Sequence, residues 1–275
     1  MTSNMASRSW VTSKLVKRLL TQPQLSPKEA LEHMKEDYNM HIHYKMILRA
    51  LKAAREEVIE NEKEQFGKVR DYLSELHRSN PGSTAIVDVI PQPKSPPVFD
   101  KLYISLDACK RGFKAGCRPL IGLDGCHLKG YFGGHLLSAV AQDANNHFFV
   151  IAYTVGLEVA LQEVMPRAHH RNCVLHIWKN FVKQWKDKQS KGLVWQCARS
   201  ATTPEFYANM DKLKSMNQPA WEYLSRFRES AWTKNQFSHY LKVDNITNNM
   251  CEVWNAKIVE YRSKPILTMC ENLRC

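Results

Sequence analysis

Residues 117–130 read CRPLIGLDGCHLKG, and this stretch decides the class of fold. Its apolar run at residues 119–123 predicts a short strand that ends at Asp124. Two more apolar runs, at residues 135–142 and 148–155, follow at the close spacing typical of strands joined by hairpins. The sequence therefore predicts a sheet here, with an acidic side chain at the end of one strand.

Upstream of this stretch, the chain changes character at a proline-rich connector. Residues 85–90 and 102–106 are short strand candidates, and the connector at residues 91–98 lies between them. Such a composition favours an extended linker. We therefore expect a boundary there, between an N-terminal region of residues 1–90 and a domain of residues 99–275.

The N-terminal region is predicted to be mostly helical. Ser26 is a suitable N-cap, Pro27 suits the first helical position, and Glu29 can bond back to the cap. Helical spacing of apolar residues also marks residues 10–20, 44–61 and 65–78, and the last run stops at the breaker Ser79-Asn80-Pro81-Gly82.

The run at residues 44–61 carries basic side chains between its apolar positions, namely Lys45, Arg49, Lys52 and Arg55. Three short helices with a basic third could form a helix-turn-helix that lays one helix in a DNA groove. The alternative is an ordinary helical bundle whose basic face is solvated. The sequence leaves both interpretations open.

Downstream of the hairpin-spaced strands the pattern is mostly helical. Helices are predicted near residues 159–165, 175–188, 206–228 and 250–261, and residues 170–174 fit a further strand. The chain therefore reads as an α/β protein with a helical N-terminal region.

Composition limits the classes of function. The chain has 275 residues, of which 44% are hydrophobic, a net charge of +12 and a pI near 9.3. A hydrophobic share of this size supports a folded core. The charge favours a polyanionic partner such as DNA, RNA or an anionic membrane surface, although a basic protein without such a partner has the same charge.

The sequence also indicates a compartment. No stretch approaches the roughly 20 apolar residues of a membrane span, and the N-terminus lacks the apolar core of a signal peptide. The eight cysteines are scattered without a CxxC pair, which is typical of reduced thiols in an intracellular protein.

Two carboxylates are candidates for chemistry. Asp124 at a strand end would be held by the sheet and still open to a metal ion, and Glu252 lies near a predicted helix start. The plainer interpretations are a turn-forming Asp-Gly pair and a first-turn glutamate that interacts with the helix dipole. Asp143 is predicted to cap a hairpin turn.

Cys173 and His176 have a two-residue spacer, at which the two side chains can share a Zn²⁺ ion. A structural zinc site needs four ligands, and the sequence shows no clear second pair. The alternative is that both side chains pack or form hydrogen bonds.

In this order, the fragments resemble the Mutator-like (MuDR) transposases of plants. The resemblance runs through residues 102–113, 117–145, 160–166, 170–181 and 249–269, and the helical N-terminus is similar to the segment that precedes these blocks in the family. The stretch CRPLIGLDGCHLKG, continued by YFGGHLL, is its longest and most specific part.

The resemblance implies an RNase H-like mixed sheet with flanking helices, and a helical insertion at about residues 177–245. It implies an Asp-Asp-Glu set that holds two Mg²⁺ ions for cleavage and joining of DNA strands. Asp124 matches the first Asp and Glu252 the Glu, while Cys173 and His176 match a Cys-x-x-His signature. Lys129, in the first block, joins the basic residues of 44–61 as a candidate for DNA contact.

The chain departs from the family after residue 155. There the family has a helix and a strand that carries the second Asp, whereas here Gly156 leads almost directly into the next helical run. The second Asp has no counterpart. The chain also begins after the family's upstream zinc-type module and stops before its downstream SWIM-type finger.

The resemblance therefore implies a nuclear DNA-binding protein, ancestrally a DDE transposase and inactive in this form. Its partners would be DNA and a second copy of the chain. Mg²⁺ is the ancestral cofactor, and Zn²⁺ at Cys173 and His176 is a weaker expectation. A domesticated nuclear regulator of transcription, and a decayed element without a stable fold, are the alternatives.

Overall fold

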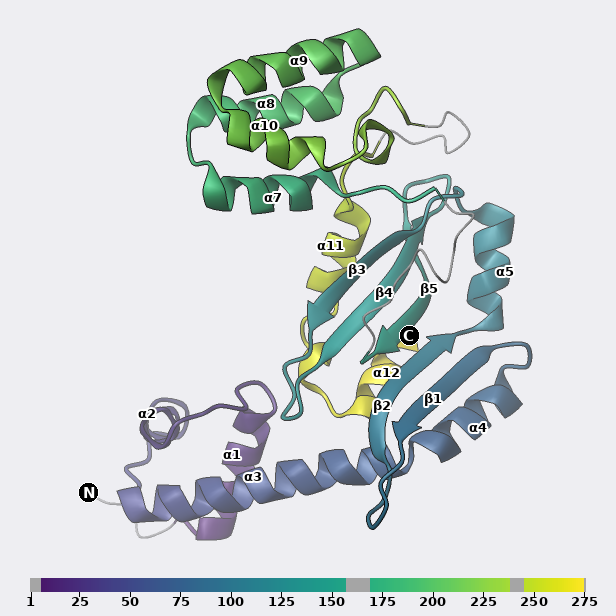
Figure 1. Ribbon diagram of the computed structural model, residues 1–275. Coiled ribbons are helices and arrows are strands. Elements are labelled where there is room, and N and C mark those ends of the chain that lie inside the picture. The colour runs from purple at the N-terminus through teal and green to yellow at the C-terminus, as the bar shows by residue number, and fades with distance from the viewer. Residues whose placement is uncertain (1–5, 157–168, 238–244, 275) are drawn as a thin grey trace.

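A five-stranded sheet forms the centre of the computed structural model, which describes residues 6–156, 169–237 and 245–274 (Figure 1). In spatial order its strands are β1 (Thr84–Ile90), β2 (Val98–Ser105), β5 (Phe148–Val155), β4 (His135–Gln142) and β3 (Gly122–His127). Helices pack on the sheet and extend from both of its ends. The chain is a mixed α/β protein with a helical N-terminal region.

Every pairing between these strands is antiparallel, so the prediction of a mixed sheet is wrong for the described residues. Short hairpins join β3 to β4 and β4 to β5, and a short connection allows only antiparallel pairing. A parallel neighbour needs a long crossover that returns to the sheet. No described segment after β5 returns to the sheet as a strand.

Strand β3 differs from its predicted bounds at both ends. It begins at Gly122 rather than at residue 119 and continues through Asp124 to His127. Asp124 is therefore in the middle of a strand and is neither at a strand end nor in a turn. The cause is pairing with β4, in which Asp124 lies opposite Ser138 and His127 lies opposite His135.

The proline-rich residues 91–97 connect β1 to β2 within the sheet. The two strands pair antiparallel, with Ile86 opposite Tyr103, so the boundary expected at residues 91–98 falls inside a hairpin. Prolines suit this loop because they lack the N–H that a strand ladder needs. Composition alone cannot distinguish such a loop from a linker.

Three helices form the N-terminal region, namely α1 (Arg8–Leu19), α2 (Pro27–Tyr38) and α3 (Tyr44–Gly67). The predicted capping box starts α2, because Ser26 Oγ accepts from Glu29 N at 3.3 Å and Glu29 Oε2 accepts from Ser26 N at 2.7 Å. The helices share their own core, which includes Val11, Leu15, Met34, Ile47 and Leu51.

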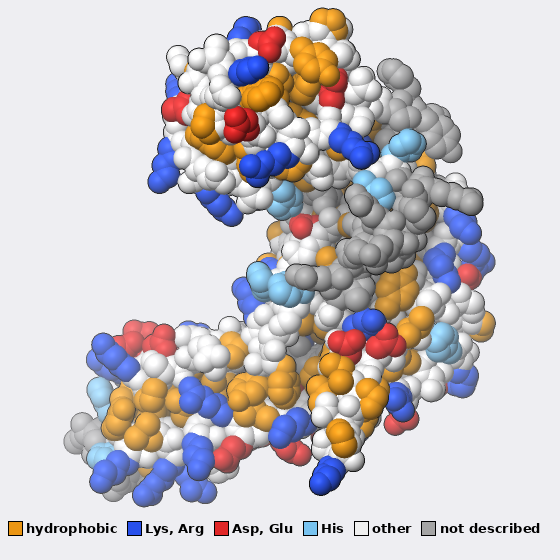
Figure 2. All heavy atoms as spheres, in the orientation of Figure 1, with side chains coloured by type: hydrophobic (Ala, Val, Ile, Leu, Met, Phe, Trp, Pro, Cys, Tyr) orange, Lys and Arg blue, Asp and Glu red, His pale blue; other side chains and the backbone are white. Residues whose placement is uncertain are grey.

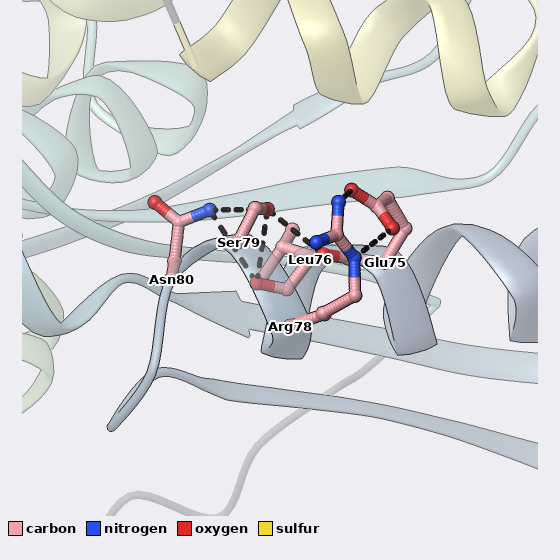
Figure 3. A network of polar contacts seen from close by, with 5 residues as sticks. All are labelled: Glu75, Leu76, Arg78, Ser79 and Asn80. Carbon is pink, nitrogen blue, oxygen red and sulfur yellow. Dashed lines mark hydrogen bonds and ion pairs between the residues drawn. The ribbon is translucent and has the colours of Figure 1, made fainter.

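Helix α4 (Val69–Ser79) ends at the predicted breaker. Asn80 N donates to Leu76 O at 2.9 Å, Ser79 Oγ donates to Glu75 O at 2.8 Å, and Asn80 Nδ2 donates to Ser79 Oγ at 2.9 Å (Figure 3). Gly82 then takes a φ of +84°, which side chains disfavour. The turn leads directly into β1.

Helices cover both faces of the sheet. Helices α4 and α12 (Ile266–Arg274) share with it a core that includes Leu73, Leu102, Ile104, Tyr153 and Met269. Helix α11 (Asn249–Lys257) packs on β3 and β4, followed by the short 3-10 helix η3 (Tyr261–Ser263). Helix α5 (Asp107–Gly116) packs on β5, where Gly112 lies against Phe149.

A separate helical cluster consists of α7 (Val174–Gln184), α8 (Lys188–Arg199), α9 (Thr203–Met216), α10 (Gln218–Ser225) and the 3-10 helix η1 (Glu229–Ala231). It packs around its own core, which includes the fully buried Phe181 and Trp232. The cluster lies where the resemblance implies an insertion at about residues 177–245.

Two elements predicted in this part of the chain differ from the structure. The helix expected at residues 206–228 is broken into α9 and α10, because Pro219 starts a new helix whose first turn donates to Asn217 Oδ1. Residues 169–173 form no strand, and Val174 begins α7. The helix expected near residues 159–165 lies outside the described residues.

Helix α3 continues past its predicted end at residue 61 and links the N-terminal region to the sheet. Its Glu62 is 5% exposed, and one carboxylate oxygen accepts from Tyr131 N at 3.2 Å in the β3–β4 loop. Phe66 contacts both Phe99 and Phe132, with ring centroids 4.9 and 5.7 Å apart. One continuous helix therefore belongs to two cores.

Stability is expected to fall as pH rises through the pKa of Glu62. Burial raises this pKa above its ordinary value, and the hydrogen bonds from Tyr131 N and Phe132 N only partly oppose the rise. Between the ordinary and the raised pKa the folded protein holds more protons than the unfolded chain, so each step up in pH destabilises it. Glu62→Gln removes the titrating group. The free energy of unfolding of this variant, measured in urea titrations, should therefore rise relative to that of the wild type between pH 4.5 and 7.5.

Glu60→Gln, on the exposed side of the same helix, is the matched control and should track the wild type at every pH. A constant difference between Glu62→Gln and the wild type across this range would contradict the prediction.

Candidate functional site

Helix α11 is attached to β3 and β4 by three side-chain hydrogen bonds. Asn248, just before the helix, donates from Nδ2 to Leu123 O at 2.9 Å. Trp254 Nε1 donates to the buried Ser138 Oγ at 3.1 Å, and Asn255 Nδ2 donates to Asp124 Oδ2 at 3.0 Å. These bonds fix which face of α11 meets the sheet.

Gly122 allows this close approach. A Cβ atom at this position would collide with Asn248 Oδ1 and would lie 2.9 Å from Cys251 Sγ. Both groups belong to the start of α11, so the absence of a side chain on β3 lets the helix lie against the strand. Burial raises the pKa of Cys251 to about 12, so its thiol stays protonated at neutral pH and is not a nucleophile.

The two sequence-predicted carboxylates lie in the same part of the molecule. Asp124 is bonded to Asn255, and Glu252 lies one helical turn before Asn255 on α11, at the spacing that places two side chains on one face. Glu252 Oε1 is 3.1 Å from Lys179 Nζ of α7. The chain of contacts therefore runs from β3 through α11 to the helical cluster.

Asn255 and Lys179 are site residues that sequence reasoning missed. A weak signal existed for each: Asn255 follows Glu252 by three residues, and Lys179 follows His176 by three. Neither spacing predicts which residue the side chain contacts. Asn255 and Asp124 are 131 positions apart in the sequence, and Lys179 and Glu252 are 73 positions apart.

The described residues do not fit a pair of Mg²⁺ ions. Mg²⁺ needs several oxygen ligands in octahedral geometry. Here Asp124 Oδ2 accepts a hydrogen bond from an amide, and Glu252 Oε1 is paired with an ammonium group. Among the residues that the structure describes, no three His, Cys, Asp or Glu side chains are grouped closely enough to hold a metal.

Cys173 and His176 have separate surroundings. Cys173 Sγ accepts from Asn248 N at 3.1 Å, so this half-buried thiol ties the start of α7 to the start of α11. The His176 side chain is exposed on α7. Cys173 thus forms a hydrogen bond at the start of α7, while the imidazole of His176 is open to solvent.

The candidate DNA-contacting residues divide into two groups. Lys45, Arg49 and Lys52 are exposed along one side of α3, and Lys129 is exposed in the β3–β4 loop. Arg55 instead donates from Nη2 to Leu25 O at 2.8 Å and is half-buried, so it holds α3 to the loop before α2.

Asp143 lies in the β4–β5 turn and caps it, as predicted. Its Oδ1 accepts from the backbone N of Asn145 and of His147, each at 2.8 Å, and Asn146 takes a φ of +65°. These hydrogen bonds hold the pKa of Asp143 below its ordinary value, with His147 N as the main cause. Asp143 therefore has a structural role at some distance along the sheet from Asp124.

The fold and the site define an α/β protein with an antiparallel sheet, an N-terminal helix whose first half carries four basic side chains, and two carboxylates that are bonded within the chain. No family model, curated protein or solved structure matches the chain. Within the described residues, no helix is long and apolar enough to cross a membrane.

Asn255→Asp is expected to cost about 2–3 kcal/mol of stability at pH 7, because it places a second carboxylate beside the half-buried Asp124 and removes the donor. Urea titrations at pH 7 measure this loss.

Asn180→Asp adds the same charge at an exposed position of α7 and should change stability by less than about 0.5 kcal/mol. Equal stability of the two variants at pH 7 would show that Asp124 does not depend on Asn255.

Proposed function

We propose that this chain is a DNA-binding protein of Mutator-like transposase ancestry that does not cleave DNA in this form. The observation that carries the proposal is the exposed basic side of α3. Lys45, Arg49 and Lys52 recur there at steps of four and three residues, which places them on one side of the helix. We call these three residues the α3 basic side.

Two apolar residues favour a partner over simple solvation. Tyr44 and Leu48 are 52% and 41% exposed, and each directly precedes a member of the α3 basic side, so both lie alongside it. A solvated face needs no large apolar groups, whereas a nucleic-acid surface uses cations for phosphates and apolar groups for sugars and bases. The net charge of +12 supports the same class of partner.

The shape of the molecule is compatible with a long polyanion. Figure 2 shows a hollow on one side, between the α1–α3 region below and the α7–α10 cluster above, with Lys and Arg side chains on both. The third side of the hollow is formed around β3 and α11. In this proposal, DNA that contacts α3 extends along this surface.

The fold we propose for the sheet with α11 is RNase H-like and lacks one helix and one strand. Its support is the three-strand meander β3–β4–β5, whose first strand carries Asp124 beside a helix that carries Glu252. In this proposal Mg²⁺ is an ancestral cofactor, and the protein acts in the nucleus. A second copy of the chain is the further partner in this proposal.

Loss of cleavage is supported by the contacts of the two carboxylates. Two-metal hydrolysis requires carboxylates that are open to both ions and carry enough charge to balance them. Asn255 and Lys179 donate to the oxygens that such ions would need. Binding without cleavage is also what a nuclear regulator of transcription requires.

The test combines binding and cleavage. We expect fluorescence anisotropy with a labelled 20-base-pair duplex to show binding. The logarithm of the binding constant should fall linearly with the logarithm of the salt concentration. Supercoiled plasmid in Mg²⁺ or Mn²⁺ should remain intact. Nicking that Asp124→Asn abolishes would overturn the claim of inactivity, and the absence of binding at low salt would overturn the proposed function.

A further inference from the structure

His127 and His135 lie directly opposite one another at the ends of β3 and β4. Leu128 N donates to Gly134 O at 2.9 Å, and these are the next residues along the two strands. His135 O accepts instead from Gly156 N, on the side of β4 that faces β5. Since hydrogen-bonded and non-hydrogen-bonded pairs alternate along an antiparallel ladder, the histidines form a non-hydrogen-bonded pair.

This kind of pair brings side chains closest. Opposite Cα atoms in non-hydrogen-bonded pairs are about 4.5 Å apart, against about 5.5 Å in the other kind. The two imidazole rings lie with centroids 4.5 Å apart and planes tilted by 50°. Both side chains are exposed, so water and ions can reach them.

The pair lies on the opposite face of the sheet from the Asp124 site. Side chains alternate between the faces of a strand, so His127 shares a face with Gly125 and Leu123 rather than with Asp124 and Cys126. Helix α11 bonds to Asp124, on the other face. A ligand held by the two histidines would therefore be independent of the carboxylates.

We propose that His127 and His135 bind one divalent ion of a late transition metal, such as Zn²⁺, Ni²⁺ or Cu²⁺. Imidazole is the side chain that these ions prefer in the absence of thiolates. A metal about 2.0–2.1 Å from each nitrogen holds the two nitrogens roughly 3–3.5 Å apart. Small χ rotations of rings centred 4.5 Å apart reach this separation.

The protein supplies two ligands and water supplies the others. The hairpin that carries the pair is fixed from outside, because Glu62 of α3 accepts from Tyr131 N in the loop between β3 and β4. Donors on rigid elements bind metals more tightly than donors on mobile loops, since less motion is lost on binding. A metal bound here joins β3 to β4 at the end of the sheet.

The test uses untagged, EDTA-treated protein and Ni²⁺ at pH 7.5. Isothermal titration should give one Ni²⁺ per chain, and saturating Ni²⁺ should raise the Tm by about 3 °C or more. His127→Gln/His135→Gln should lose both effects, and each single variant should weaken Kd by about tenfold or more.

The matched control is His41→Gln/His176→Gln, which removes two other exposed histidines from separate places, the second of them three residues after Cys173. It should bind Ni²⁺ like the wild type. Circular dichroism in the absence of metal establishes that each variant is folded.

Three results would overturn the proposal. One is stoichiometric binding that persists unchanged in His127→Gln/His135→Gln. Another is binding that the control variant loses, which would assign the ion to His41 or His176. The third is the absence of any binding or Tm shift for the wild type up to millimolar Ni²⁺, which would mean that the rings only pack against each other. None of these measurements depends on DNA binding by α3, so the metal site and the proposed function are tested separately.

Discussion

Replacing Lys45, Arg49 and Lys52 with glutamate is expected to weaken DNA binding by about 100-fold near 0.1 M salt, because three phosphate contacts become repulsive. The slope of the logarithm of the binding constant against the logarithm of salt concentration should fall by about 3. Fluorescence anisotropy at several salt concentrations measures both quantities. All three side chains are exposed, so the fold should survive.

Lys52 is expected to contribute slightly less than Arg49. It lies 3.9 Å from Glu56 on the next turn, and a phosphate contact must replace this exposed ion pair, which is worth less than about 1 kcal/mol. The single variant Lys52→Glu should therefore show a somewhat smaller loss than Arg49→Glu.

The control must carry the same change in charge. Lys94→Glu/Lys114→Glu/Lys212→Glu changes three exposed lysines on the β1–β2 hairpin, α5 and α9, and like the α3 variant it lowers the net charge from +12 to +6. Equal losses in the two triple variants would mean that overall charge, rather than the α3 basic side, is responsible.

Phe181→Ala is expected to destabilise the α7–α10 cluster by about 3–5 kcal/mol. Phe181 is fully buried, and its ring lies 4.8 Å from that of Trp185 and 6.1 Å from that of Tyr223. Truncation removes a large apolar surface and leaves a cavity that three helices cannot close without losing other contacts.

Tryptophan fluorescence in urea reports this change, because five of the seven tryptophans belong to the cluster, namely Trp178, Trp185, Trp195, Trp221 and Trp232. Tyr207→Ala is the control, since this aromatic residue of α9 is 55% exposed and should cost less than about 0.5 kcal/mol. Similar urea midpoints for the two variants would contradict the assigned core.

Local signals in the sequence predicted many elements correctly. The capping box at Ser26 and Glu29 starts α2, and the breaker after Ser79 ends α4. The apolar runs at residues 135–142 and 148–155 are strands with the predicted bounds. These features depend on residues only a few positions apart, so nearby letters suffice to predict them.

Predictions failed where a distant segment decides the outcome. The Asp-Gly pair in β3 looks like a strand end, yet pairing with β4 keeps it extended as far as His127. The prolines of residues 91–97 look like a linker, yet β1 and β2 pair on either side of them.

The candidate site was likewise predicted only in part from the sequence. Asp124 and Glu252 were singled out from the sequence, and α11 brings them into one region through Asn255. The donors that engage them, Asn255 and Lys179, were not found, because each contact joins elements that are remote along the chain.

The sequence by itself determined the α/β class of the fold, the helical N-terminus and most strands, and it singled out two carboxylates as candidates, because periodicity, capping and turn chemistry are local. Only the tertiary structure decided the antiparallel pairing, the donors to the carboxylates and the opposed His127 and His135. Those features depend on strand register and on how helices dock. Long-range packing selects the strand register and the docking of the helices, so neither can be predicted from a short stretch of sequence.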